Sequence, residues 1–479
     1  MKSNFHAYET PQFRVLSDEQ VQEIHFASLE ILERTGVIVL EQEAQSLLVD
    51  AGARTDNNNK FWIPSYLVES AIRTVPKRVT LCDRDGSRNV KLEGNKSYFG
   101  TGSDCPNILD SFTGARRRMT KEDVAQAARL CDYLPNIDFI MSLGLISDVP
   151  WEIYDKQQFE TMMLNTKKPI VFTATDRSGM EGIVKMASLV AGGEENLKKN
   201  PFICLYAEPV SPLKHVETAL RKLLFAAEKE IPALYTTGGM AGATLPVTLA
   251  GALAVSNAEI LCGLVIHQLK KPGAPFISGG VLSIMDMQTT NFSYGAPEFY
   301  LMSAGMADLC HYYGLPIYST AGCSDSKVVD QQAAVEASIS CMITALSGAN
   351  LIHDIGYLES GLTGSFEMIV LTDEILNMVK RIMRGIPVTS ETLALDTIDR
   401  VGPGGQYISD EHTYLNFKKE FWFPRLINRQ RYEPWVNGGS KTLGDRLNVE
   451  VKRILGEHQP DPIPEKLAKE IHTIAVEKV

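Results

Sequence analysis

Eight short apolar runs that alternate with longer stretches of helical period restrict the fold of this chain more than any other sequence feature. The runs are residues 98–100, 139–141, 170–173, 202–205, 233–236, 276–278, 317–319 and 351–353. Several of them follow a proline, which is tolerated at the first position of a strand because its missing N–H costs least there. We therefore expect eight strands.

The stretches between the runs have the period of helices. In residues 215–229, apolar side chains at Val216, Leu220 and Leu224 recur at four-residue steps, as on one helix face. Buried strands separated by single helices pair in parallel through right-handed crossovers, in an open sheet or a closed barrel. Eight repeats in this length favour an α/β fold, a (β/α)8 TIM barrel over residues 96–395. An open doubly wound sheet is the alternative.

Two further segments flank the predicted barrel. Ser17 and Gln20 form a capping-box pattern that opens a helix, and residues 61–64 and 79–81 have the pattern of short edge strands. Residues 1–95 are thus expected to form an added α+β cap or oligomerisation layer, and we expect a homo-oligomer. Residues 396–479 are expected to form a helical and irregular extension that packs on the barrel.

Charge and apolar patterning exclude several partners. The chain has 47 basic and 58 acidic residues, so its net charge of -11 disfavours nucleic acid. The first residues have no apolar core of the kind a signal peptide needs. The longest apolar stretch, residues 245–269, contains Ser256, Asn257 and Glu259, which predicts a buried helix and not a membrane span. We expect a cytoplasmic protein whose eight cysteines are reduced, since none forms a C-x-x-C pair.

Candidate site residues follow from the barrel, because active sites of this fold lie at the carboxyl ends of the strands. Acidic and aromatic side chains gather there, and such a set suits a cationic methylated amine. For each acid the alternative is a capping role, and for His353 it is a hydrogen-bonded core histidine. The selected substrate contacts are Phe99, Asp104, Tyr206, Glu208, Thr236, Thr237, Gly238, Gly239, Asp325, His353 and Tyr357.

Two weaker patterns stay open. The glycine-rich loop 236–244 could face an anion or let a large planar cofactor approach closely, or it is simply a tight turn. Zinc is the other alternative, but its potential ligands are scattered in the sequence, and nothing fixes which of them would converge. These ligands are Cys105, Cys204, Cys323, His353 and Glu208.

The order of the strand-end motifs resembles that of a known family. The motifs include Thr236-Thr-Gly-Gly-Met-Ala-Gly-Ala-Thr, Ser278-Gly-Gly-Val, Ala321-Gly-Cys-Ser-Asp-Ser-Lys and His353-Asp-Ile-Gly-Tyr-Leu-Glu-Ser-Gly. They resemble the trimethylamine methyltransferase superfamily over nearly the whole chain. The resemblance implies a barrel that moves a methyl group from a methylated amine to the cobalt of a corrinoid on a small separate protein, within anaerobic one-carbon metabolism related to methanogenesis.

One departure from the family pattern narrows the expected substrate. The trimethylamine enzymes carry pyrrolysine in the region aligned with residues 322–327, whereas every residue here is standard. The chain therefore resembles the non-pyrrolysine branch, which includes glycine betaine methyltransferase. A quaternary ammonium already carries its charge and leaves as a neutral amine, so no catalytic side chain is obligatory. Cob(I)alamin is itself the nucleophile, and the protein needs only to position the N–CH3 bond.

The sequence thus predicts an enzyme that transfers a methyl group from glycine betaine to cob(I)alamin and releases dimethylglycine. Proline betaine and carnitine are the next candidates. Glu208 and Asp104 would face the ammonium. Donors for the carboxylate would be His353, Thr236 and Thr237, and the N–H groups of Gly238 and Gly239. No tightly bound metal is expected. The rival hypotheses are a zinc-dependent methyltransferase for a thiol or an alcohol, and a non-catalytic betaine-binding barrel.

Overall fold

A curled sheet of parallel strands forms the centre of the molecule. The structure, a computed structural model, describes residues 12–56, 58–86 and 89–477. Seven strands lie in the order β6-β17-β16-β14-β12-β10-β9 and are paired in parallel throughout. They are β6 (Tyr98–Thr101), β9 (Ile170–Phe172), β10 (Ile203–Ala207), β12 (Ala233–Tyr235), β14 (Phe276–Gly279), β16 (Ile317–Thr320) and β17 (Leu351–Ile355).

The segment around Phe139 closes this sheet into a barrel. Phe139 pairs in parallel with Gly100 of β6, and Ile140 pairs with Ile170 of β9. The Thr101 hydroxyl replaces part of the ladder, since it donates to the Met141 carbonyl at 2.7 Å and accepts from the Met141 N–H at 3.0 Å. A Cβ on Gly100 would lie 2.6 Å from the Phe139 ring, so only glycine permits this approach. The predicted barrel is confirmed, with its second strand reduced to bridges.

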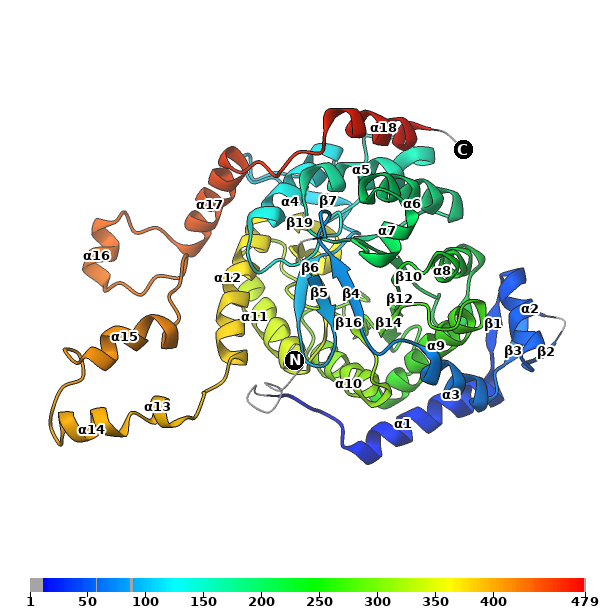
Figure 1. Ribbon diagram of the computed structural model, residues 1–479, viewed down its shortest axis with the longest axis horizontal. Coiled ribbons are helices and arrows are strands. Elements are labelled where there is room, and N and C mark those ends of the chain that lie inside the picture. The colour runs from blue at the N-terminus through cyan, green and yellow to red at the C-terminus, as the bar shows by residue number, and fades with distance from the viewer. Residues whose placement is uncertain (1–11, 57, 87–88, 478–479) are drawn as a thin grey trace.

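Helices surround the barrel (Figure 1). They are α4 (Lys121–Tyr133), α5 (Tyr154–Asn165), α6 (Arg177–Ala191), α7 (Glu194–Lys199), α8 (Glu217–Lys229), α9 (Leu249–Lys270), α10 (Pro297–Tyr313), α11 (Gln331–Leu346) and α12 (Phe366–Met383), with short 3-10 turns at Trp151–Ile153 and Glu359–Gly361. By length and composition α9 could cross a membrane, but most of it is buried inside the protein. It packs against α8, α10 and three helices of the N-terminal layer, so it is a core helix.

The N-terminal layer covers one side and the amino end of the barrel. Its elements are α1 (Asp18–Glu30), a π-helical turn (Ile31–Thr35), α2 (Gln42–Asp50), α3 (Ser65–Thr74), β1 (Val37–Val39), β2 (Arg54–Thr55), β3 (Lys60–Trp62), β4 (Val79–Cys82) and β5 (Asn89–Leu92), and β11 (Lys214–His215) pairs with β1. The capping box of Ser17 and Gln20 is present at α1. The β4–β5 hairpin lies at the amino ends of β10 and β9, because the Cys82 and Arg84 N–H groups donate to the carbonyls of Pro201 and Lys167.

Small sheets border the opposite, carboxyl end, which we call the mouth. Four strands in the order β18-β19-β7-β8 follow β6 and β17, and β13 pairs with β15 after β12 and β14. These strands are β7 (Asn107–Leu109), β8 (Arg116–Arg118), β13 (Met240–Ala241), β15 (Ser283–Ile284), β18 (Tyr357–Leu358) and β19 (Thr363–Ser365).

The C-terminal extension has two parts. Helices α13 (Ser390–Leu393), α14 (Leu395–Val401), α15 (Glu411–Glu420) and α16 (Tyr432–Asn437) project away from the barrel (Figure 1). By contrast, α17 (Leu443–Glu457) packs on α12 and α4, and α18 (Glu465–Val476) packs on α5 and α6. The sequence predicts that residues 396–479 pack on the barrel. Most of the packing of this extension on the barrel is made by α17 and α18.

Candidate active site

Three carboxyl groups from different strands meet at the mouth. Asp104 follows β6, Glu208 follows β10 and Asp354 lies in β17. Burial raises the pKa of each carboxyl, and the negative charge of Asp104 raises the pKa values of Glu208 and Asp354 further. Carboxylates interact in this way only when they are near neighbours in a medium that screens poorly. The mouth is therefore a site of concentrated negative charge.

Each of these carboxyl residues is bonded to a different tyrosine. Tyr206 donates its hydroxyl to Glu208 Oε2 at 2.9 Å, and Tyr294 donates to Asp354 Oδ2 at 3.0 Å. The Tyr357 hydroxyl accepts from the Asp104 N–H at 2.6 Å. The result is an acidic site with aromatic walls.

The backbone of Asp354 adopts an unusual conformation that sets the direction of its side chain. Its φ is 72°, in the left-handed region that non-glycine residues seldom adopt. The pairing of β17 with β6 also shifts register between Ile352 and Ile355, and such bulges re-aim side chains next to active sites. A Cβ on Gly102 would lie 2.2 Å from Asp354 Oδ1 and 2.3 Å from the Tyr357 hydroxyl. Gly102 thus makes room for both groups.

The neighbouring residue His353 contacts the Asp354 carboxyl. Burial lowers the pKa of His353 to about 3, so the ring is neutral at pH 7. Its Nδ1 lies 3.1 Å from the Ser319 carbonyl and 3.1 Å from the Thr320 hydroxyl. Its Nε2 lies 3.2 Å from Asp354 Oδ1. A neutral ring at this distance gives the Asp354 carboxyl no cationic partner on this side.

Asp325 positions a wall of the site without being part of it. Its carboxylate accepts from the Ser293 hydroxyl, from the backbone N–H groups of Tyr294 at 2.8 Å and Gly295 at 3.0 Å, and from the Ser360 hydroxyl at 2.9 Å. It thereby ties the loop before α10 to the segment after β18. The Tyr294 ring is held over the mouth by this anchor.

The threonines of the glycine-rich loop are engaged elsewhere. The Thr236 hydroxyl donates to the Gly279 carbonyl at 3.1 Å, and that of Thr237 donates to Glu259 Oε2 at 2.5 Å. A Cβ on Gly239 would lie 2.1 Å from Leu245, so this glycine allows a tight turn. Helix α9 begins only after β13, at Leu249, so the loop does not open the helix directly.

The remaining predicted residues divide between core and site. Phe99 is fully buried in the hydrophobic core. Gly238 adjoins Glu208, since a Cβ there would lie 3.4 Å from Oε2. Within residues 12–477, where the structure describes them, no three His, Cys, Asp or Glu side chains converge as a metal site would require. Cys105, Cys204 and Cys323 are buried, and burial raises their pKa values.

Sequence reasoning missed Tyr294 and Tyr318. Tyr318 lies inside a strand, with its ring centroid 4.3 Å from that of His353 and 5.9 Å from that of Tyr206. Tyr294 lies in the long loop between β15 and α10, away from any strand end. The alternation along β16 could have pointed to Tyr318, but no local pattern marks Tyr294.

Exposed apolar side chains surround the mouth on the loops that follow the strands. We call this set the apolar rim. Exposed hydrophobic side chains are unremarkable singly, but a set around one opening marks an interaction surface. The rim consists of Leu145, Trp151, Val210, Val247, Met287, Val328 and Leu362.

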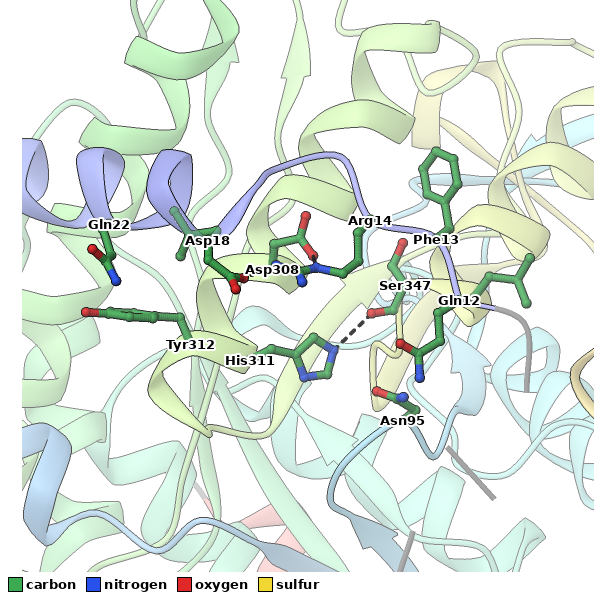
Figure 2. A pocket seen from close by; sticks show the side chains of 12 residues that line it. Gln12, Phe13, Arg14, Asp18, Gln22, Asn95, Asp308, His311, Tyr312 and Ser347 are labelled. Atoms are coloured by element: carbon green, nitrogen blue, oxygen red, sulfur yellow. Dashed lines mark hydrogen bonds and ion pairs between the residues drawn. The ribbon is translucent and has the colours of Figure 1, made fainter. Parts of the chain in front are cut away.

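A separate pocket lies at the other end of the barrel (Figure 2). Its volume is about 520 Å³, and its wall includes Arg14, Asn95, Asp308, His311 and Ser347. Asn95 precedes β6 and Ser347 precedes β17, so the pocket faces the amino ends of the strands. In this fold, that end carries stability and not chemistry. The ion pair of Arg14 with Asp308 ties the N-terminal segment to α10 there.

Comparison with known proteins assigns the barrel to a family. The family model for trimethylamine methyltransferase (MTTB) matches residues 2–478. The chain belongs to the trimethylamine methyltransferase family. Within this family, it is 36% identical over 462 residues to a trimethylamine methyltransferase of Desulfitobacterium hafniense strain DCB-2, covering 96% of this chain and 93% of that one. It is 31% identical over 464 residues to a glycine betaine methyltransferase of strain Y51, covering 96% of each chain.

A solved structure of a monomethylamine methyltransferase has the same fold. The monomethylamine methyltransferase of Methanosarcina barkeri matches 93% of this chain and 88% of its own at a TM-score of 0.53 and 12% identity. The resemblance to the trimethylamine methyltransferase family is confirmed, and the chain is a methyltransferase. The standard residues at 322–327 and the betaine relative agree with the non-pyrrolysine branch of the family.

Proposed function

We propose that this protein transfers a methyl group from a quaternary amine to a corrinoid that a partner protein presents at the mouth. The observation that carries the proposal is the cluster of Asp104, Glu208 and Asp354. In the part of the chain that the structure describes, no basic side chain lowers the pKa of Asp104 or Asp354. A bound cation would supply the missing countercharge, and the tyrosine rings would offer it their faces.

The residues of this chain would bind, orient and dehydrate the substrate. Asp104, Glu208 and Asp354 hold the ammonium. Tyr206 and Tyr294 fix the carboxyl groups of Glu208 and Asp354, and Tyr357 fixes the backbone of Asp104. Such positioning aligns the N–CH3 bond of the substrate with the nucleophile that approaches it. Because positive charge leaves nitrogen during transfer, a loose cage serves the transition state better than a tight one.

The apolar rim fits the partner that this reaction needs. When bound, the reduced corrinoid would supply the nucleophile that accepts the methyl group, and the amine would depart with the electron pair of its N–C bond. A large apolar macrocycle and its carrier must cover the mouth and exclude water. Trp151, Met287 and Val247 are exposed by 71, 62 and 67% and would become buried in this contact.

Glycine betaine is the first candidate substrate, and dimethylglycine its product. Gly238 adjoins Glu208, since a Cβ there would lie 3.4 Å from Oε2, and the N–H groups of Gly238 and Gly239 would meet the substrate carboxylate next to the ammonium site. Eight buried thiols are in keeping with a reducing cytoplasm, where we place the reaction.

A donor panel tests the proposed function. We expect purified protein mixed with free cob(I)alamin to form methylcobalamin from glycine betaine or another quaternary amine, and to show at most a trace of product with trimethylamine. The absorbance change of the corrinoid is the measurement. Faster transfer from trimethylamine, or transfer that stops when metal is removed by a chelator, would disprove the proposal.

Substrate affinity should depend on pH in a direction that the carboxyl groups set. Burial raises the pKa values of Asp104, Glu208 and Asp354, so they take up protons at a higher pH than exposed carboxyls, which titrate near about 4. A protonated carboxyl does not attract a cation. We therefore expect the Kd of the quaternary amine to rise as pH falls from 8 to 5, with protons released on binding. Calorimetry in two buffers of different ionisation enthalpy measures both effects, and a Kd independent of pH would contradict them.

A further inference from the structure

Residues 386–423, which we call the arm, expose an unusual amount of apolar surface. Among the arm residues classed as buried, intermediate or exposed, Thr397 alone is buried. Ile386 and Ile408 are each 82% exposed and Tyr414 is 77% exposed. The exposed large apolar residues of the arm are Ile386, Val388, Leu393, Leu395, Ile398, Tyr407, Ile408, Tyr414, Leu415, Phe421 and Phe423.

The helices of the arm are too short to be stable without packing against another surface. Its helices α13, α14 and α15 have 4, 7 and 10 residues, and isolated helices shorter than about 12–15 residues are marginal in water. Helices in proteins are stabilised mainly by packing of an apolar face. Such a face must therefore be covered for these helices to persist.

The exposed area matches that of a stable protein interface. Four aromatic side chains of the arm are between 44 and 77% exposed, which amounts to roughly 500 Å² at about 200 Å² for each ring. The aliphatic side chains add a comparable area. A standard interface buries about 800 Å² on each partner, and the largest apolar patch of a monomer is usually about 300–600 Å².

The position of the arm separates it from the corrinoid partner. The arm leaves the barrel after the carboxyl end of α12, where Lys380 lies 3.7 Å from Asp138, just before the Phe139 segment. It returns to the same place, since Arg381 donates to the Glu420 carbonyl at 2.9 Å. This is the amino end of the barrel, opposite the mouth. A carrier that covers the mouth does not reach it.

We propose that a second copy of this chain covers the arm, with each arm lying on the α11 face of the other copy. Helix α11 presents Val335 and Ile339 one turn apart, exposed by 57 and 42%, beside the half-buried Met342. This helix packs next to α12, where the arm begins. In a twofold dimer one contact type occurs twice, so both arms and both α11 faces are covered at once.

Two charges placed in the arm should break the dimer. We expect the full chain to have the mass of two copies by light scattering at micromolar concentration, and the I408D/Y414D variant to have the mass of one, with Kd raised at least 100-fold. The matched control is V49D/L189D, which puts the same charges at residues exposed by 47 and 37% outside the arm. Far-UV circular dichroism checks that each variant is folded.

Crosslinking tests whether the arm of one copy lies on α11 of the other. All eight native cysteines are buried, so a bismaleimide should react chiefly with Ile408→Cys and Ile339→Cys introduced together. We expect a covalent dimer from this pair and none from Ile408→Cys with Val49→Cys. A monomeric wild-type chain, a dimer that I408D/Y414D leaves intact, or a crosslink confined to one chain would each overturn the proposal. None of these outcomes depends on methyl transfer, so the proposed function is tested separately.

Discussion

Asp354→Asn is expected to lower kcat/KM for the quaternary amine by about 100–4000-fold, because removing one side of a buried charge pair costs about 3–5 kcal/mol. The substitution keeps the shape of the side chain, and asparagine tolerates the left-handed backbone that Asp354 adopts at φ 72°. Methylcobalamin formation at saturating cob(I)alamin measures the loss. Asp286→Asn, which changes an acid of the loop after β15, should leave the rate unchanged and is the matched control.

The same variant should be more stable than the wild type when no substrate is bound. The folded-state pKa of Asp354 lies well above its ordinary value, so the folded protein binds more protons than the unfolded chain between these two pKa values. The stability of the wild type therefore falls as pH rises through that window, and asparagine removes this loss. We expect a higher Tm for the variant at pH 8 and a smaller difference at pH 5. A less stable variant would show that Asp354 is structural, and a fully active one would remove it from the site.

Gly102→Ala is expected to abolish transfer although it adds only a methyl group. The new Cβ would lie 2.2 Å from Asp354 Oδ1 and 2.3 Å from the Tyr357 hydroxyl, so both groups must move. Overpacking of this kind typically costs about 1–3 kcal/mol of stability. Activity should fall more than stability does, by at least about 100-fold, because a displacement near 1 Å in a positioned site has that effect on rate.

Gly456→Ala is the control for this substitution. Its Cβ would meet nothing within 4 Å in helix α17, and alanine favours a helix by up to about 1 kcal/mol over glycine. We expect this control to keep full activity and to unfold at an equal or higher temperature. Normal kinetics in Gly102→Ala would mean that Asp354 and Tyr357 do not act together on the substrate.

The barrel could be predicted because its signal is local. Buried parallel strands are short apolar runs whatever lies around them, and seven of the eight predicted runs are regular strands. The run 139–141 fails to form one because the Thr101 side chain takes over hydrogen bonds that a strand would make, and this pairing depends on a distant residue.

The site was partly predictable for a related reason. Asp104, Tyr206, Glu208 and Tyr357 follow or end strands, so the topology alone brings them to the mouth. Tyr294 is placed by Asp325 through a long loop, which no periodicity reveals. Thr236 and Thr237 occupy strand ends as well, yet their hydroxyls bond to Gly279 and Glu259, because a rule about position does not specify the direction of a side chain.

The anchor at Asp325 has a consequence for how such enzymes diversify. Asp325 holds the loop before α10 through the backbone N–H groups of residues 294 and 295, which nearly every amino acid possesses. The path of the loop is thus independent of the ring at position 294. Evolution can exchange that ring for another group and change the preferred methyl donor while the scaffold is preserved.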